Sequence, residues 1–190
     1  MQYEPKNFDH LLGLTGFSDA MLKSHFTLYQ GYVTNTNKLS EEMETTIPGT
    51  PQYAELKRRF GWEWNGMRLH ELYFGNMSPE ILSINKESEL YKNIEKEWGS
   101  LDMWEKDFRA MGVMRGIGWI ILYHDVASGK LFNVWINEHD VGHLAGATPL
   151  LVMDVFEHAY ISDYGLKRAD YIEAFMKAID WGKIEKRFLE

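Results

Sequence analysis

The sequence pattern changes after Gly112 from one typical of helices to one that includes strands, and this change limits the possible folds more than any other feature. Before it, Ser18 can cap a helix that reaches at least Tyr32. After the polar stretch Ser40–Pro51, a second long helix is expected from Gln52 to about Tyr73, because Pro51 tolerates the first helical turn. Two long helices joined by a polar turn predict an antiparallel hairpin.

The rest of the chain predicts shorter helices and three strands. Helical segments are expected from Ser78-Pro79 to about Trp98, from Gly99-Ser100 to Met111, and at Asp170–Asp180. Three short runs are rich in β-branched and aromatic residues, which is typical of strands: Gly116–Tyr123, Leu131–Ile136 and Thr148–Met153. The connection Asp125–Lys130 contains Gly129 and favours a hairpin. The layout is an all-helical first half and a second half of three strands flanked by helices.

Composition excludes several classes of function. The chain has no cysteine, so a bound metal ion would take nitrogen and oxygen ligands. Its 20 basic and 28 acidic residues give a net charge of −8, which argues against a nucleic-acid-binding protein. No apolar run approaches the ~20 residues of a membrane helix. The first twenty residues lack the basic start and apolar core of an export signal. We therefore expect a cytoplasmic protein that binds neither nucleic acid nor membrane.

Three of the seven histidines form a possible set with one aspartate. His25 and His70 lie on the two long helices, and an antiparallel hairpin can bring their faces together. Asp154 ends an apolar strand, where an unpaired buried charge is costly, and His158 follows four residues later. A metal ion would satisfy all four side chains. Three imidazoles and one carboxylate suit manganese, iron or zinc.

The same residues stand in motifs that resemble those of the iron/manganese superoxide dismutase family. The strongest motif is DVFEHAY at Asp154–Tyr160, which is close to the family's D-x-W-E-H-A-Y. Seven weaker matches follow the family's order: GYVTNTN from Gly31, HELYF from His70, WGSL from Trp98, GIGW from Gly116, GKL from Gly129, KRADY from Lys167 and AIDW from Ala178. The resemblance covers nearly the whole chain. It implies an α+β fold: an N-terminal helical hairpin domain (residues 1–84), then an α/β domain (residues 85–190) with a three-stranded antiparallel sheet flanked by helices.

The resemblance also implies an activity, a cofactor and a partner. The protein is expected to be a superoxide dismutase that converts superoxide to oxygen and hydrogen peroxide by redox cycling of one iron or manganese ion per subunit. Carried over residue by residue, the family's metal ligands fall on His25, His70, Asp154 and His158. Tyr32 matches the gateway tyrosine beside the metal-bound solvent, and Arg168 matches the substrate-funnel arginine. The alternatives for these two are an interfacial tyrosine and a surface ion pair. Glu157 matches a buried acid that bridges to the ligand histidine of a second subunit, which implies a homodimer or a tetramer.

The family's glutamine, which hydrogen-bonds the bound solvent, comes from one of two places. The helical place, four residues before His70, holds Gly66. The other place, fifteen residues before Asp154, holds His139. We expect His139 to take this role, as histidine does in some family members. The alternative is a solvated loop histidine.

The chain departs from the family near the first ligand. The stretch from His25 to Tyr32 is one residue shorter than usual, so alignment from Tyr32 puts Ser24 in the ligand's place. We favour His25, because serine is a poor ligand for such an ion. The family's outer histidine on this helix is replaced by Leu28 or Tyr29.

Two other departures lie near the last ligand. The family's cross-subunit tyrosine is replaced by Ile161, and Phe156 stands where the family has tryptophan. His10, His124 and His143 are expected to be structural or surface residues. Two other functions stay open: a metal-binding or scaffold descendant without activity, and a dioxygenase using the same ion. Dioxygenases usually use two histidines and one carboxylate, so the third histidine argues against the latter.

Overall fold

A computed structural model describes residues 2–80 and 82–190. The first half is helical: η1 (Asp9–Leu11), α1 (Asp19–Thr45), α2 (Pro51–Gly75), α3 (Glu89–Trp98) and α4 (Leu101–Gly112). The second half contains the strands and the remaining helices: β1 (Gly118–Asp125), β2 (Lys130–Asn137), β3 (Thr148–Asp154), η2 (Glu157–Ala159), α5 (Ile161–Tyr164), α6 (Arg168–Lys177) and α7 (Trp181–Leu189). Within the described residues, none of the helices combines the length and the apolar character needed to cross a membrane.

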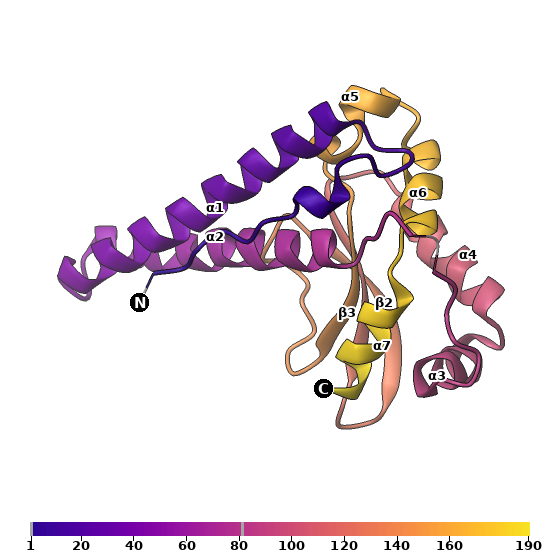
Figure 1. Ribbon diagram of the computed structural model, residues 1–190. Coiled ribbons are helices and arrows are strands. Elements are labelled where there is room, and N and C mark those ends of the chain that lie inside the picture. The colour runs from indigo at the N-terminus through magenta and orange to yellow at the C-terminus, as the bar shows by residue number, and fades with distance from the viewer. Residues whose placement is uncertain (1, 81) are drawn as a thin grey trace.

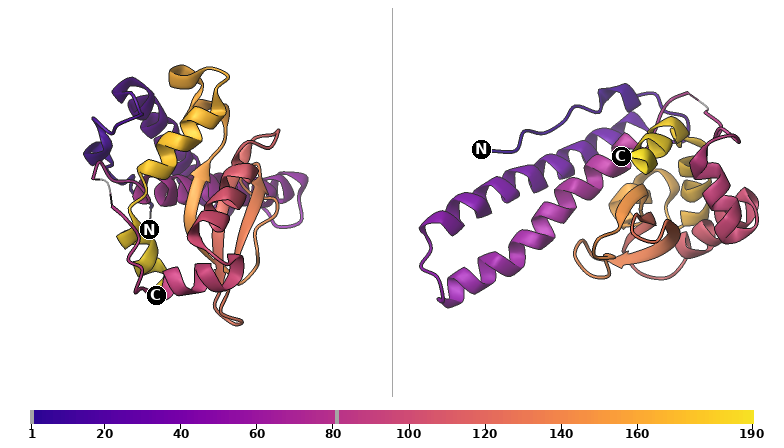
Figure 2. Two further views of the ribbon diagram at one scale, coloured as in Figure 1. Left: turned by 90° about the vertical axis from the view of Figure 1, so that its right-hand side faces the viewer. Right: turned by 90° about the horizontal axis from the view of Figure 1, so that it is seen from below.

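The helices α1 and α2 form a long hairpin that projects from the sheet-containing half of the molecule (Figure 1 and Figure 2). Both begin where the sequence predicts, because the hydroxyls of Ser18 and Thr50 accept hydrogen bonds from backbone N–H groups in the first turn. However, α1 continues to Thr45, beyond the interruption predicted at Ser40. The Ser40 hydroxyl donates to the carbonyl of Thr36 at 2.9 Å, so this polar residue is accommodated inside the helix.

The three strands form one antiparallel sheet in the order β2-β1-β3. Six consecutive residues of the central strand, Gly118–Tyr123, are buried, because helices cover the sheet. In the strand register Trp119 lies opposite Asp154, which places the start of β1 beside the end of β3. The predicted fold, a helical hairpin followed by an antiparallel sheet flanked by helices, is confirmed.

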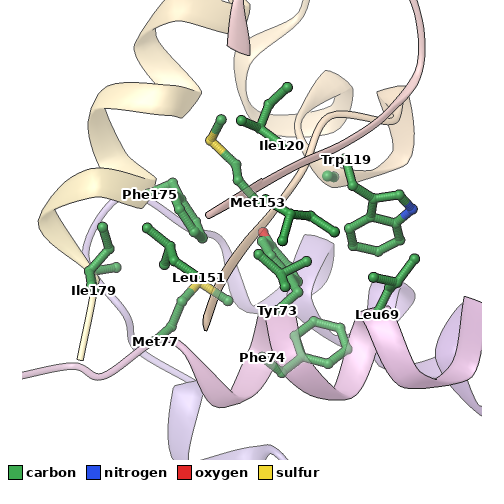
Figure 3. Close-up of a cluster of buried hydrophobic side chains, with 14 of the residues drawn as sticks. Leu69, Tyr73, Phe74, Met77, Trp119, Ile120, Leu151, Met153, Phe175 and Ile179 are labelled. Atoms are coloured by element: carbon green, nitrogen blue, oxygen red, sulfur yellow. The ribbon is translucent and has the colours of Figure 1, made fainter. Parts of the chain in front are cut away.

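One core joins the end of α2 to the sheet and to α6 (Figure 3). In it the stacked rings of Tyr73 and Phe175 lie beside Leu151 and Met153 of β3. This core includes residues from both halves of the chain. The division into domains at residues 84 and 85 therefore stays a prediction.

Asn76 fixes the end of α2 to β3. Its Nδ2 donates to the carbonyl of Val152 at 2.5 Å, and its Oδ1 accepts from Arg187 of α7. Arg187 also donates to the carbonyl of Leu150 at 2.7 Å. Because Asn76 is fully buried, these bonds hold α2, β3 and α7 in one register. They thereby set the distance between His70 on α2 and the end of β3.

One long-range backbone pairing changes the bounds of two predicted helices. Met77 and Ile179 form an isolated antiparallel bridge, and the backbone N–H of Ser78 donates across it at 2.8 Å. This backbone pairs with a distant segment instead of starting a helix, so the helix predicted from Ser78-Pro79 begins only at Glu89. The helix predicted at Asp170–Asp180 is present as α6, but it starts at Arg168 and ends at Lys177, two residues before Ile179 of the bridge. The helix α7, which begins at Trp181, was not predicted.

Candidate metal centre

Four side chains from four elements converge at the base of the hairpin. They are His25 from α1, His70 from α2, Asp154 from the end of β3 and His158 from η2. One possible ligand atom from each residue lies within 4.8 Å of the others. The side chains of the first three are completely buried, whereas that of His158 is 30% exposed. The structure thus brings together all four predicted ligands.

The nitrogen atoms of this cluster point at one carboxylate oxygen. Oδ2 of Asp154 lies 3.2 Å from Nε2 of His25, 3.7 Å from Nε2 of His70 and 3.1 Å from Nε2 of His158. Its other oxygen, Oδ1, accepts from the backbone N–H of Phe156 at 2.8 Å, which fixes the carboxylate orientation. The donor atoms therefore surround a common point.

Two of the buried imidazoles have ring nitrogens without hydrogen-bond partners. Both ring nitrogens of His25 and Nε2 of His70 lack a partner among the described residues. Nδ1 of His70 lies 2.6 Å from the carbonyl of Gly66, which only accepts, so the ring hydrogen is on Nδ1. This tautomer leaves the lone pair of Nε2 facing Asp154. Buried polar atoms are seldom left unpaired. The unpaired ring nitrogens therefore indicate a binding site for a further group, such as a metal ion.

Burial gives these groups the charge states that suit a metal ion. It lowers the pKa of both His25 and His70, so both rings are neutral and present lone pairs. Burial alone would raise the pKa of Asp154, but the neighbouring His158 and His25 outweigh it and hold that pKa well below its usual range. Neutral imidazoles around an ionised carboxylate fit a cation such as iron, manganese or zinc.

Tyr32 and His139 meet beside the cluster although they are far apart in sequence. The Tyr32 hydroxyl oxygen lies 2.8 Å from Nε2 of His139, and the Tyr32 ring stacks on His70 with 5.1 Å between centroids. Nδ1 of His139 accepts from the indole N–H of Trp119 at 3.1 Å. Because burial lowers the pKa of His139 to about 4, its single ring hydrogen is on Nε2 and donates to Tyr32. The hydroxyl hydrogen of Tyr32 is then free to donate to a molecule at the ion.

The structure explains why the side chain of His139, and not one from residue 66, lies beside Tyr32 where the family's glutamine is expected. A Cβ on Gly66 would lie 2.6 Å from Cδ1 of Tyr32, so the Tyr32 ring fills the space that a longer side chain would need. His139 is fully buried, which rules out the alternative of a solvated loop histidine.

The shortened stretch before Tyr32 is accommodated by an unbroken α-helix. His25 and Tyr32 lie on one face of α1, about two turns apart. Ser24 is exposed, and its hydroxyl donates to the carbonyl of Ala20 at 2.9 Å. His25 and not Ser24 therefore joins the cluster.

Aromatic side chains form the wall around these groups. Phe156 stacks on His139 and on His158, with centroid distances of 4.8 and 5.3 Å. Phe156 thus contributes an aromatic ring to the wall at the position where the family has tryptophan. Trp62 of α2, which no sequence motif singles out, lies edge-on to His139, with 4.5 Å between the ring centroids.

Two predicted site residues remain, Glu157 and Arg168. Glu157 is exposed in the single chain, so the burial expected from its motif is absent there. Arg168 donates from Nη1 to the carbonyl of Gly116 at 2.9 Å, and its Nε and Nη2 are buried without partners among the described residues. It makes no ion pair within those residues, contrary to the surface-pair alternative.

The other three histidines lie outside the cluster. His124 stacks on Phe188, and His10 is exposed near Phe8. His143 hydrogen-bonds the carbonyl of His139 at 2.8 Å, a contact that no sequence pattern indicates.

Comparison with known proteins gives consistent matches. The family model of the C-terminal domain of iron/manganese superoxide dismutases matches residues 86–187. The protein named superoxide dismutase (Fe) from Aquifex pyrophilus is 37% identical, over 97% of this chain and 90% of its own length. That from Cupriavidus metallidurans is 35% identical, over 92% of this chain and 90% of its own length. Superoxide dismutase (Mn) 2 of Haloferax volcanii is 36% identical, over 86% of this chain and 82% of its own length. Both metals thus occur in the names of its relatives.

Proposed function

The chain belongs to the iron/manganese superoxide dismutase family, and we infer from this that it converts superoxide to oxygen and hydrogen peroxide with one iron or manganese ion per subunit. The observation that carries the assignment is the convergence of three imidazoles and one carboxylate on a common point. In this proposal the ion is held by His25, His70, Asp154 and His158. The relatives favour this function over a descendant that only binds metal or serves as a scaffold.

A bound ion supplies one-electron chemistry, through which two superoxide anions and two protons become one oxygen molecule and one hydrogen peroxide molecule. Two residues of this chain, Tyr32 and His139, control the hydrogen bond that is donated to the substrate. Burial raises the pKa of Tyr32, so its phenol stays protonated at neutral pH. Because His139 donates to the phenol oxygen, the Tyr32 hydrogen is directed to a partner in the site. Tyr32 therefore donates a hydrogen bond to the anion, and His139 fixes the direction of that bond.

Arg168 provides local attraction for an anionic substrate in a chain of net charge −8. Its guanidinium lies 5.8 Å from the ring centroids of both Trp135 and Tyr160, and no acidic side chain among the described residues neutralises it. An unpaired guanidinium raises the local potential even where the overall charge is negative. This supports its role in the substrate funnel.

A second copy of the chain fits the face around His158. Glu157 and part of His158 are exposed there, as a bridge between subunits requires. Ile161 and Leu166 follow closely in the sequence, and 45% and 96% of their surfaces are exposed. Both side chains are therefore accessible to a second copy of the chain. We expect a homodimer in which Glu157 of each subunit hydrogen-bonds the partner's His158.

Reconstitution with each metal tests the proposed function. Protein loaded separately with iron and with manganese is assayed with a riboflavin or xanthine oxidase superoxide source, and metal content is measured in parallel. At least one form should be active. His25→Ala should lose both metal and activity, whereas its neighbour Ser24→Ala, which removes an exposed side chain, should keep both. An inactive parent with both metals would overturn the assignment, and equal behaviour of the two variants would overturn His25 as a ligand.

A further inference from the structure

The loop between β2 and β3 carries His139 into the site with a strained backbone. Glu138, just before it, has a φ of 54°, which is rare for a residue other than glycine. Asn137 and Val141 close the turn by exchanging two backbone hydrogen bonds, at 2.9 and 3.2 Å. Such a conformation persists only where neighbouring contacts hold it.

His143 provides one of these contacts through a defined tautomer. Its Nε2 lies 2.8 Å from the carbonyl of His139, and a carbonyl only accepts, so Nε2 carries the hydrogen. Its Nδ1 lies 2.6 Å from the hydroxyl of Tyr123. Burial raises the pKa of Tyr123 to about 12, so the phenol is protonated at neutral pH and donates to Nδ1. Both ring nitrogens of His143 are thereby used.

The carbonyl of His139 needs this partner. His139 is fully buried, and no backbone N–H in the described residues donates to its carbonyl. An unpaired carbonyl at such a place is costly. Tyr123, at the other end of the chain of hydrogen bonds, is itself buried in the central strand β1. The loop is therefore anchored to the central strand of the sheet.

We propose that His143, held by Tyr123, is a positioning residue that fixes the backbone of His139 and so places its imidazole against the Tyr32 hydroxyl. The proposal rests on the proposed function, because it concerns the same proton-handling pair. His143 touches none of the four ligands and acts only through His139. Its loss should change how the site works without removing the ion.

Two substitutions of similar size separate hydrogen bonding from packing. In His143→Gln the amide nitrogen can take the place of Nε2 and donate to the carbonyl, whereas His143→Leu cannot donate. The side chain of His143 lines a cavity of about 520 Å³ together with Tyr123 and Arg68, so either replacement has room. A third variant, Tyr123→Phe, removes only the hydroxyl that orients the imidazole. His124→Leu, on the same strand as Tyr123 but outside this chain of bonds, is the control.

The readouts are kcat, KM, the midpoint potential of the bound metal, metal content and the thermal unfolding midpoint. His143→Leu should lower kcat roughly 10-fold, as loss of outer hydrogen bonds around metal sites does, and shift the potential at full metal content. His143→Gln should restore kcat to within about 2-fold of the parent, because the donor to the carbonyl is kept. Tyr123→Phe should fall between these two, and His124→Leu should match the parent.

The outcomes distinguish this proposal from the one on which it rests. A parent protein inactive with both metals would overturn the proposed function. An active parent with an unchanged kcat and potential in His143→Leu would overturn the positioning role alone. Equal losses in the leucine and glutamine variants would also overturn it, because they would show a packing effect. If His143→Leu does not fold, an unchanged Tyr123→Phe would overturn the proposal instead.

Discussion

Replacing Gly66 by alanine should displace Tyr32 from its position beside the ion. The added Cβ would lie 2.6 Å from Cδ1 and 2.7 Å from Cε1 of the Tyr32 ring, whereas ordinary contacts begin at 3.4 Å. The ring must therefore move by about 0.8 Å (3.4 − 2.6). It cannot retreat freely, because its hydroxyl is bonded to His139 and its face stacks on His70.

The change in stability is the sum of two opposed effects. Alanine in a helix interior is more stable than glycine by about 1 kcal/mol. Overpacking a buried site costs about 1–3 kcal/mol. The net loss for Gly66→Ala is about 1 kcal/mol, which lowers the unfolding midpoint by roughly 2–4 °C in a chain of this size. Gly61 lies on the same helix with nothing within 4 Å of an added Cβ, so Gly61→Ala should raise the midpoint by a similar amount.

Thermal unfolding and superoxide dismutase assays of the two variants, at matched metal content, test this reasoning. Gly66→Ala should lose about 10- to 100-fold in activity, because displacements near 1 Å have effects of that size. Gly61→Ala should keep full activity. In a Tyr32→Ala background the clash is gone, and Gly66→Ala should become stabilising. Equal stabilisation by both alanines in the parent, with activity kept, would refute the steric argument.

Three further results are expected. Glu157→Ala should weaken both dimer formation and metal retention, as followed by sedimentation velocity and metal analysis; a fully metallated, active dimer would contradict the bridge. Asn76→Ala leaves the carbonyl of Val152 and a hydrogen of Arg187 unpaired and should lower stability by about 3 kcal/mol in urea unfolding. A change below 1 kcal/mol would show that these bonds are replaced by others. Removing the ion with a chelator should lower the thermal midpoint by about 5–10 °C, since free ion at 100 times Kd contributes about 2.7 kcal/mol. An unchanged midpoint would argue against the cluster as a metal site.

Local patterns in the sequence predict much of the fold. Ser18 and Thr50 mark the starts of α1 and α2, because capping depends on residues within one turn. The β-branched and aromatic runs likewise place the strands close to their observed bounds. The bridge between Met77 and Ile179 was missed, since pairing over about a hundred residues leaves no periodic signal.

Part of the candidate site could likewise be predicted from the sequence, and part could not. The four side chains that cluster could be selected from the sequence, because histidine and aspartate at these positions suit one ion and match a family's motifs. The contacts that Trp62 and His143 make with His139 could not, since only the folded chain brings these residues together. The sequence also could not show that the Tyr32 ring occupies the space beside Gly66.

The unequal exposure of the four proposed ligands would affect how the ion is exchanged. Only His158 meets solvent, so in a lone chain the shortest path for an incoming or departing ion runs past that ring. A second copy of the chain bound over Glu157 would block this path. Release of the ion to a chelator should then slow as protein concentration rises, and the cofactor would be kept longest where the protein is most abundant.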